Sequence, residues 1–176
     1  RQREVLAMSK MKKLSFRKFV ERARRRGAEQ EMLWELDHMS GWEDFWLHKD
    51  APKWCIWLAP HVFGGRWPAA EREVLMRKPL WATIYAHTVI RGRWPEAEPM
   101  IASHAEASYW YARDVIRGRW PEGEPAIAQS MYWAYWYARG IVRGRWPEGE
   151  PAIAKYPRLA YEYARDIIRG RFPEAE

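Results

Sequence analysis

A six-residue word returns every 26 residues in the second half of this chain and constrains its fold more than any other feature. The word Arg-Gly-Arg-Trp-Pro-Glu begins at Arg91, Arg117 and Arg143, and returns from Arg169 with phenylalanine in place of tryptophan. A period of this length indicates one supersecondary unit per repeat, which cannot bury its apolar face alone. Neighbouring units must therefore stack to share a core.

The period continues towards the N-terminus in a weaker form. The sequence Gly65-Arg66-Trp67-Pro68 lies 27 residues before the first full word, and residues 50–67 match residues 155–172 at recurring proline, alanine and glycine positions. We therefore assign residues 40–176 to about five 26-residue helix pairs. Residues 1–39 lack the repeat and form a basic helical N-terminal cap or arm.

Each repeat predicts one longer and one shorter helix. Prolines suit the first position of the longer helix, where no N–H is needed. The glycine of each word suits the left-handed position just after that helix, at Gly92, Gly118, Gly144 and Gly170. The longer helices are expected at 52–64, 79–91, 105–117, 131–143 and 157–169.

The start of the shorter helix is left open by the sequence. It follows a proline such as Pro147, but Pro151 comes four residues later, where a regular helix would clash. The element is short, begins later, or kinks. The predicted fold is all-α, with tandem helix pairs forming a small α-solenoid behind the N-terminal cap.

The longer helices carry an unexpected outward face. Counted from Pro157 as position 1, apolar residues recur at positions 3, 4, 7, 8, 11 and 12, which form a broad buried stripe. Positions 2, 6, 9 and 13 point outward, yet the middle repeats place large apolar side chains there. Such patches mark interaction surfaces when they are exposed. The alternative is that another helical layer or the N-terminal segment covers these side chains. The expected partner-binding residues are Ile84, Trp110, Arg113, Tyr132, Trp136 and Arg139.

Two of these arginines follow a tryptophan by three residues. On a helix Trp110 and Arg113 are neighbours, as are Trp136 and Arg139. We therefore expect each guanidinium to lie over the indole ring.

The recurring word also predicts internal contacts. Its second arginine and the glutamates behind it repeat together, which favours a ladder of Arg–Glu pairs between neighbouring units. An arginine ladder that binds a phosphate backbone is the alternative. The tryptophan of the word is expected to fill the joint between the two helices, and the tyrosine at position 7 is expected to bond to an adjacent repeat.

The positive charge is concentrated at the N-terminus. Residues 1–26 carry a net charge of +9, whereas the whole chain carries +7. Residues 15–27 predict a capped amphipathic helix that ends at glycine. Such a helix serves as a polar cap of the array, as a nucleic-acid site or as a docking site for a protein. The nucleic-acid candidates are Lys12, Lys13, Arg17, Lys18, Arg22, Arg24, Arg25 and Arg26.

Enzyme, metal and cofactor chemistry find no support in the sequence. The five histidines show no metal-ligand spacing, and a single cysteine excludes a disulfide framework and a Cys-based zinc site. No phosphate-binding glycine loop or nucleophile motif occurs. No apolar stretch approaches the ~20 residues of a membrane span. We expect a non-enzyme that needs no cofactor or metal and does not enter a membrane.

The stretch Tyr-Ala-Arg-Asp-Val-Ile-Arg-Gly-Arg-Trp-Pro-Glu at 111–122, followed by Gly-Glu-Pro-Ala-Ile-Ala, resembles a short helical repeat of bacteriophage and related viral proteins of unassigned function. The resemblance covers residues 79–176 closely and 50–78 loosely. It implies a phage origin and a soluble protein of the host cytoplasm or the virion. It carries over no catalytic residue.

These observations favour a non-catalytic protein–protein interaction protein. It would dock on a host or viral protein, as a host- or defence-directed binder or as a virion component, because repeat arrays present extended surfaces. The alternative is a nucleic-acid-binding protein that acts through the basic N-terminal helix. Assembly into a homo-oligomer stays open beside both.

Overall fold

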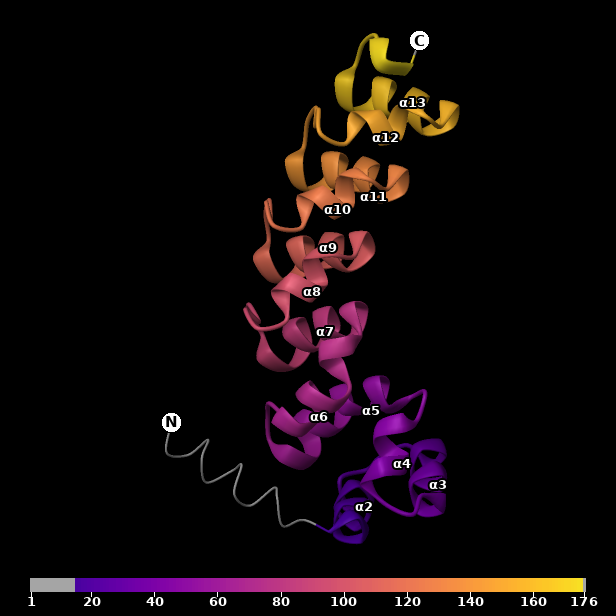
Figure 1. The fold of residues 1–176 in the computed structure, drawn as a ribbon, viewed down its shortest axis with the longest axis vertical. Helices are drawn as coiled ribbons and strands as arrows, with labels where there is room; N and C mark the ends of the chain where they lie inside the picture. Colours follow the sequence, from indigo (N-terminus) through magenta and orange to yellow (C-terminus); the bar gives the residue numbers. More distant parts are fainter. Residues whose placement is uncertain (1–14, 176) are drawn as a thin grey trace. The chain divides into compact units, whose positions relative to one another are not determined.

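The structure is a computed structural model that describes residues 15–175, and every regular element in that range is a helix or a helical turn (Figure 1). The all-α class is thereby confirmed for these residues. Internal contacts divide the chain into an N-terminal unit that ends at Trp81 and a C-terminal unit that begins at Ala82. The helices of residues 40–81 therefore group with the N-terminal segment rather than with the later repeats.

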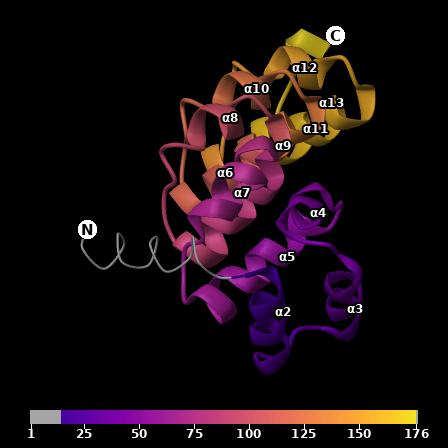
Figure 2. The ribbon, with the colours of Figure 1, turned by 60° about the horizontal axis from the view of Figure 1, so that its bottom comes forward.

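The N-terminal unit is built around aromatic side chains. Helix α2 packs against α3 and against the π turn that extends α5 (Figure 2). The apolar face predicted for α2 is buried at Phe19, Val20 and Ala23. The ring of Phe19 lies 4.6 Å from that of Trp42, centroid to centroid. The elements are α2 (Phe16–Arg25), α3 (Gln30–His38), α4 (Trp42–Leu47), α5 (Ala51–Leu58), the π turn Ala59–Phe63, α6 (Pro68–Glu73) and the 3-10 turn Leu75–Arg77.

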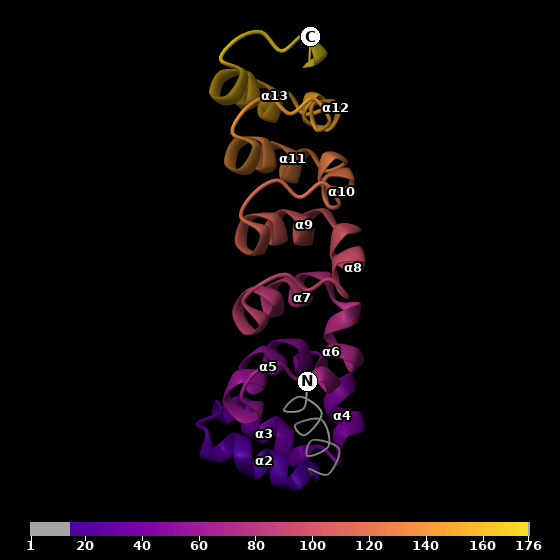
Figure 3. The same cartoon turned by 90° about the vertical axis from the view of Figure 1, so that its left-hand side faces the viewer.

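The C-terminal unit consists of stacked helix pairs. Helix α9 packs on α11, α11 packs on α13, and α8 packs on α10. The longer helices of this unit follow one side of the stack and the shorter ones the other (Figure 3). The winding of a solenoid stays a prediction. The longer helices are α7 (Pro79–Tyr85), whose last four residues belong to this unit, α9 (Ala105–Tyr111), α11 (Met131–Tyr137) and α13 (Pro157–Tyr163); the shorter ones are α8 (Glu98–Ala102), α10 (Glu124–Ala128) and α12 (Glu150–Ala154).

The shorter helices begin later than their first proline. In the last pair, residues 147–149 form a turn and α12 begins at Glu150. Pro151 then occupies the first turn of the helix, where its missing N–H costs no bond. Of the three alternatives, two are therefore correct together: the helix begins later than Pro147 and is short, with five residues.

The ends of the longer helices correct one expectation. Each helix closes with a five-residue π turn, at Ala86–Ile90, Ala112–Ile116, Ala138–Val142 and Ala164–Ile168. The left-handed residue that follows is the arginine before the glycine, with φ between 56° and 62° at Arg91, Arg117, Arg143 and Arg169. None of the four expected glycines has a positive φ in the left-handed range.

The wider π turn explains why the left-handed position comes one residue early. After α9 the N–H groups of Arg117 and Gly118 both donate to the carbonyl of Ala112, the first residue of the π turn. These two hydrogen bonds to one carbonyl close the helix end. In the weaker first copy the equivalent left-handed residue is a glycine, Gly64, with φ 79°.

An Arg143→Gly substitution should therefore stabilise the protein, by up to about 1 kcal/mol, because glycine adopts the left-handed region without a Cβ clash. The measurement is the midpoint of urea unfolding at unchanged m-value. The matched control is Gly64→Ala, which introduces the clash and should cost a similar amount. A less stable Arg143→Gly protein would show that the arginine side chain contributes more than its backbone strain costs.

Candidate interaction surface

The residues predicted to bind a partner lie on successive longer helices. Ile84 belongs to α7, Trp110 to α9, and Tyr132 and Trp136 to α11. Ile84 is 41 % exposed and Tyr132 is 48 % exposed. Both tryptophans are half-buried rather than buried. Each therefore keeps a part of its ring open to solvent.

The predicted stacking of arginine on tryptophan is confirmed. The guanidinium carbon of Arg113 lies 3.9 Å from the centroid of the Trp110 ring. The same carbon of Arg139 lies 5.5 Å from the centroid of the Trp136 ring. Such contacts order both side chains at exposed sites and contribute about 0.5–1 kcal/mol each.

The two arginines are held differently. Arg113 donates to both carboxylate oxygens of Asp114, at 2.7 and 3.0 Å. The residue after Arg139 is Gly140, so Arg139 instead donates to the hydroxyl of Tyr135, at 3.0 Å. Arg139 is therefore held by a hydroxyl group, and it also interacts electrostatically with Asp166 of the next repeat.

One aromatic residue of this surface was missed by sequence reasoning. Trp133 occupies position 3, which was expected to be buried, but it is half-buried. Its ring lies 5.9 Å from that of Trp110 and 4.9 Å from that of Tyr132. It thereby joins the side chains of α9 and α11 into one patch. The available signal was a tryptophan where the neighbouring repeats have Ala107 and Leu159. We call Ile84, Trp110, Tyr132, Trp133 and Trp136 the aromatic stripe.

The basic helix α2 presents its cations to solvent. All six described candidates are exposed, and they lie on the helix whose other face is buried by Phe19, Val20 and Ala23. Arg24 forms an ion pair with Asp37 of α3 at 2.6 Å. Lys12 and Lys13 lie outside the described residues. The exposed candidates are Arg17, Lys18, Arg22, Arg24, Arg25 and Arg26.

An ionisable cluster recurs inside the C-terminal unit. Arg93 donates to both carboxylate oxygens of Glu98 at 2.7 Å. Tyr111 of α9 donates its hydroxyl to Glu98 at 2.7 Å. The same hydroxyl accepts the backbone N–H of Trp94, also at 2.7 Å. The tyrosine thus connects its own helix with the turn and short helix that precede it, as expected for position 7.

The next two repeats build the same cluster. The ion pairs lie within one unit, between residues five positions apart, and not between neighbouring units as expected. The reason is local, because the Trp-Pro turn brings the glutamate two residues after the word back to the second arginine of the word. The glutamate that ends the word, such as Glu122, attracts the guanidinium of the preceding unit, such as that of Arg93, only weakly. The equivalent sets are Arg119, Trp120, Glu124 and Tyr137, and Arg145, Trp146, Glu150 and Tyr163.

The electrostatics of this cluster suit a structural role. The bond from Arg119 is the main cause that lowers the pKa of Glu124, and the Tyr137 hydroxyl adds to it. Burial raises the pKa of Tyr137. Glu124 therefore stays ionised and Tyr137 stays protonated near neutral pH, so that neither exchanges a proton. The tryptophan beside them, Trp120, is 1 % exposed and fills the joint between the helices as expected.

Among residues 15–175 no group of three or more histidine, cysteine, aspartate and glutamate side chains is placed to hold a metal ion. Cys55 is buried, and burial raises the pKa of its thiol. No helix in the described part of the chain is both long and apolar enough to cross a bilayer.

A Tyr137→Phe substitution should destabilise the protein by about 1–3 kcal/mol, because it leaves the buried N–H of Trp120 without its acceptor. The phenyl ring keeps the packing against Trp146. Urea unfolding measures the loss, and Tyr132→Phe, which removes an exposed hydroxyl, is the matched control and should change little. Equal stability of the Tyr137→Phe protein would contradict a structural role for the bridge.

Acid should also weaken this cluster. The folded-state pKa values of Glu98, Glu124 and Glu150 are lowered from the usual 4.5. Their stabilisation is fully present above that value and is lost as the pH falls through the lower folded-state values. Urea unfolding between about pH 6 and about pH 3 should show the decline. Replacement of all three by glutamine should flatten this dependence, whereas Glu43→Gln at an exposed site should leave it unchanged.

Neither a protein-family model, nor a curated protein, nor a solved structure matches this chain.

Proposed function

We propose that this protein is a non-catalytic binding protein of phage or related viral origin that docks on another protein through the aromatic stripe. The viral origin is supported by the repeat word alone. The docking role is supported by one observation above all: Trp110 and Trp136 remain partly open to solvent while an arginine orders each ring.

Ordered aromatic side chains are efficient anchors for a protein interface. Tryptophan, tyrosine and arginine dominate interface hot spots, where one truncation costs about 2 kcal/mol or more. Rings that are already fixed lose less conformational entropy on binding. In the stripe, Trp133 contacts both Trp110 and Tyr132, so the anchors form one patch across α9 and α11.

The last repeat marks the limit of the stripe. Position 6 of α13 is Glu162 instead of tryptophan, and this carboxylate accepts a bond from Arg158 at 3.2 Å. A solvated ion pair therefore replaces the anchor there. The change indicates that large apolar side chains at position 6 are not required for stacking of the repeats.

The test compares capture from a lysate of host or infected cells by the wild-type chain and by Trp110→Ala/Trp136→Ala. The double variant should fold, because both rings are only half-buried, and should lose the proteins that the wild type captures. Circular dichroism checks the fold. The matched control is Tyr156→Ala/Tyr161→Ala, which removes two exposed aromatic side chains outside the stripe, 48 % and 64 % exposed, and should capture as the wild type does.

Equal capture by the Trp110→Ala/Trp136→Ala variant would show that the stripe is not the docking site. The alternative function, nucleic-acid binding through α2, predicts a different pattern. Capture would then depend on nucleic acid in the lysate and would collapse between low and moderate salt. An interface anchored by aromatic side chains should lose much less.

A further inference from the structure

A second row of side chains in the C-terminal unit is not explained by packing. Arg91, Arg117, Arg143 and Arg169 follow the π turns at the ends of the four longer helices, and all four are exposed. All four adopt the left-handed backbone region, with φ between 56° and 62°. That region costs a non-glycine residue about 1–2 kcal/mol. We call these four residues the arginine row.

Glycine would suit these positions better on backbone grounds. The first copy of the repeat has Gly64 there. Strained residues that recur point to a role for the side chain. The arginines lie at helix C-termini, where a cation is favourable by only about 0.3–1 kcal/mol. That gain does not exceed the cost of the strain.

The arginine row also differs from the arginines two residues further on. Arg93, Arg119 and Arg145 each bind both oxygens of a glutamate. No carboxylate within residues 15–175 forms an ion pair with any member of the arginine row. Glu98, Glu124 and Glu150 are bound by these other arginines, so the near balance of charge in the sequence does not reflect the local charge at the arginine row.

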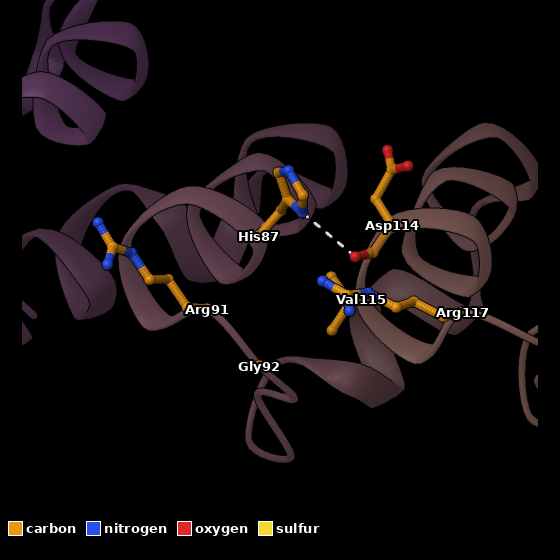
Figure 4. A pocket seen from close by; sticks show the side chains of 6 residues that line it. All are labelled: His87, Arg91, Gly92, Asp114, Val115 and Arg117. Atoms are coloured by element: carbon orange, nitrogen blue, oxygen red, sulfur yellow. Dashed lines mark hydrogen bonds between the residues drawn. The ribbon is translucent and has the colours of Figure 1, made fainter.

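A groove separates the first two members of the row. It has a volume of about 460 Å³ and is lined by His87, Arg91, Gly92, Asp114, Val115 and Arg117 (Figure 4). The ring nitrogen Nδ1 of His87 lies 3.2 Å from the backbone carbonyl oxygen of Asp114. The carboxylate of Asp114 is bound on both oxygens by Arg113. Of the two members of the row that line the groove, Arg117 extends its side chain toward Val115, whereas the side chain of Arg91 points away (Figure 4).

The spacing of the row follows from the stacking of the helices. The first two π turns contact each other, as do the last two, and packed helices lie about 8–10 Å apart. Four guanidinium groups at such intervals suit a linear anion with regularly repeated charges better than a single small ion. A nucleic-acid backbone has this character, and arginine binds phosphate oxygens through two parallel bonds.

We propose that the arginine row binds the phosphodiester backbone of a nucleic acid, at a site separate from both the aromatic stripe and helix α2. Each guanidinium donates to the oxygens of one phosphate. The binding is independent of base sequence, because phosphate contacts carry no sequence information.

The test uses the full chain and fluorescein-labelled 20-mers, namely dT20, rU20 and a mixed-sequence DNA duplex, in anisotropy titrations from 50 to 200 mM salt. The informative variant replaces the four arginines of the row by glycine, which fits the left-handed backbone as Gly64 does. The logarithm of the binding constant falls linearly with the logarithm of the salt concentration, and each neutralised phosphate of a single strand contributes about 0.7 to that slope. The glycine variant should therefore have a slope smaller by about 3, and the contribution of the row to wild-type affinity should fall about 50-fold across this range.

Two further variants make the result decisive. Replacement of the four arginines by lysine keeps the charge and should retain most of the binding. Replacement of Arg17, Lys18, Arg22 and Arg25 by alanine removes four exposed charges from α2 and should leave the contribution of the row unchanged. The proposal is overturned if the wild type binds none of the three probes at 50 mM salt. It is also overturned if the glycine variant binds as the wild type does, or if the α2 variant loses as much binding as the glycine variant. The aromatic stripe is intact in every variant, so these outcomes are separate from those of protein capture.

Discussion

The C-terminal unit depends on one tyrosine hydroxyl per repeat. This hydroxyl accepts the backbone N–H of the tryptophan in the preceding turn and donates to a glutamate that an arginine already holds. The N–H group is buried beside the tryptophan ring, so its bond is costly to lose. Because the bond joins the turn to the next longer helix, it sets where that helix lies. The same geometry occurs three times within the unit, with hydroxyl to nitrogen distances of 2.7, 2.9 and 2.8 Å.

A repeated internal geometry produces repeated surface rows. Once each helix is fixed against the turn before it, a side chain at a given position of one helix has a counterpart at the same position of the next. The arginine row is one such position, 13, and the aromatic stripe combines position 6 of three helices with positions 2 and 3 of α11. Their chemistry differs because the sequence is free to vary at positions that the hydroxyl bridge does not use. Glu162 and Gly140 are examples of this freedom.

Much of this architecture was predictable from the period. The helix pairs, the buried tryptophans of the word and the stacking of Arg113 on Trp110 follow from spacing, since positions three apart on a helix are neighbours. The partners of charged residues were not predictable in the same way. Arg93 has two glutamates close in sequence, Glu96 and Glu98, and only the turn geometry decides that Glu98 receives both bonds. The exposure of Trp133 likewise depends on how α9 and α11 pack, which a single helix period does not contain.

The helix ends show most clearly why local sequence rules miss a recurring structural feature. A glycine just after a helix predicts a left-handed glycine, because that is the least strained arrangement. Here a π turn moves the left-handed position back onto Arg117, and the glycine beside it takes another conformation. The rule fails at the residues where strain, exposure and an unpaired charge coincide. In the first copy, where Gly64 replaces the arginine, the rule holds and the cation is absent. The contrast within one chain separates what the helix end requires, a left-handed residue, from what the later repeats add to it, a positive charge.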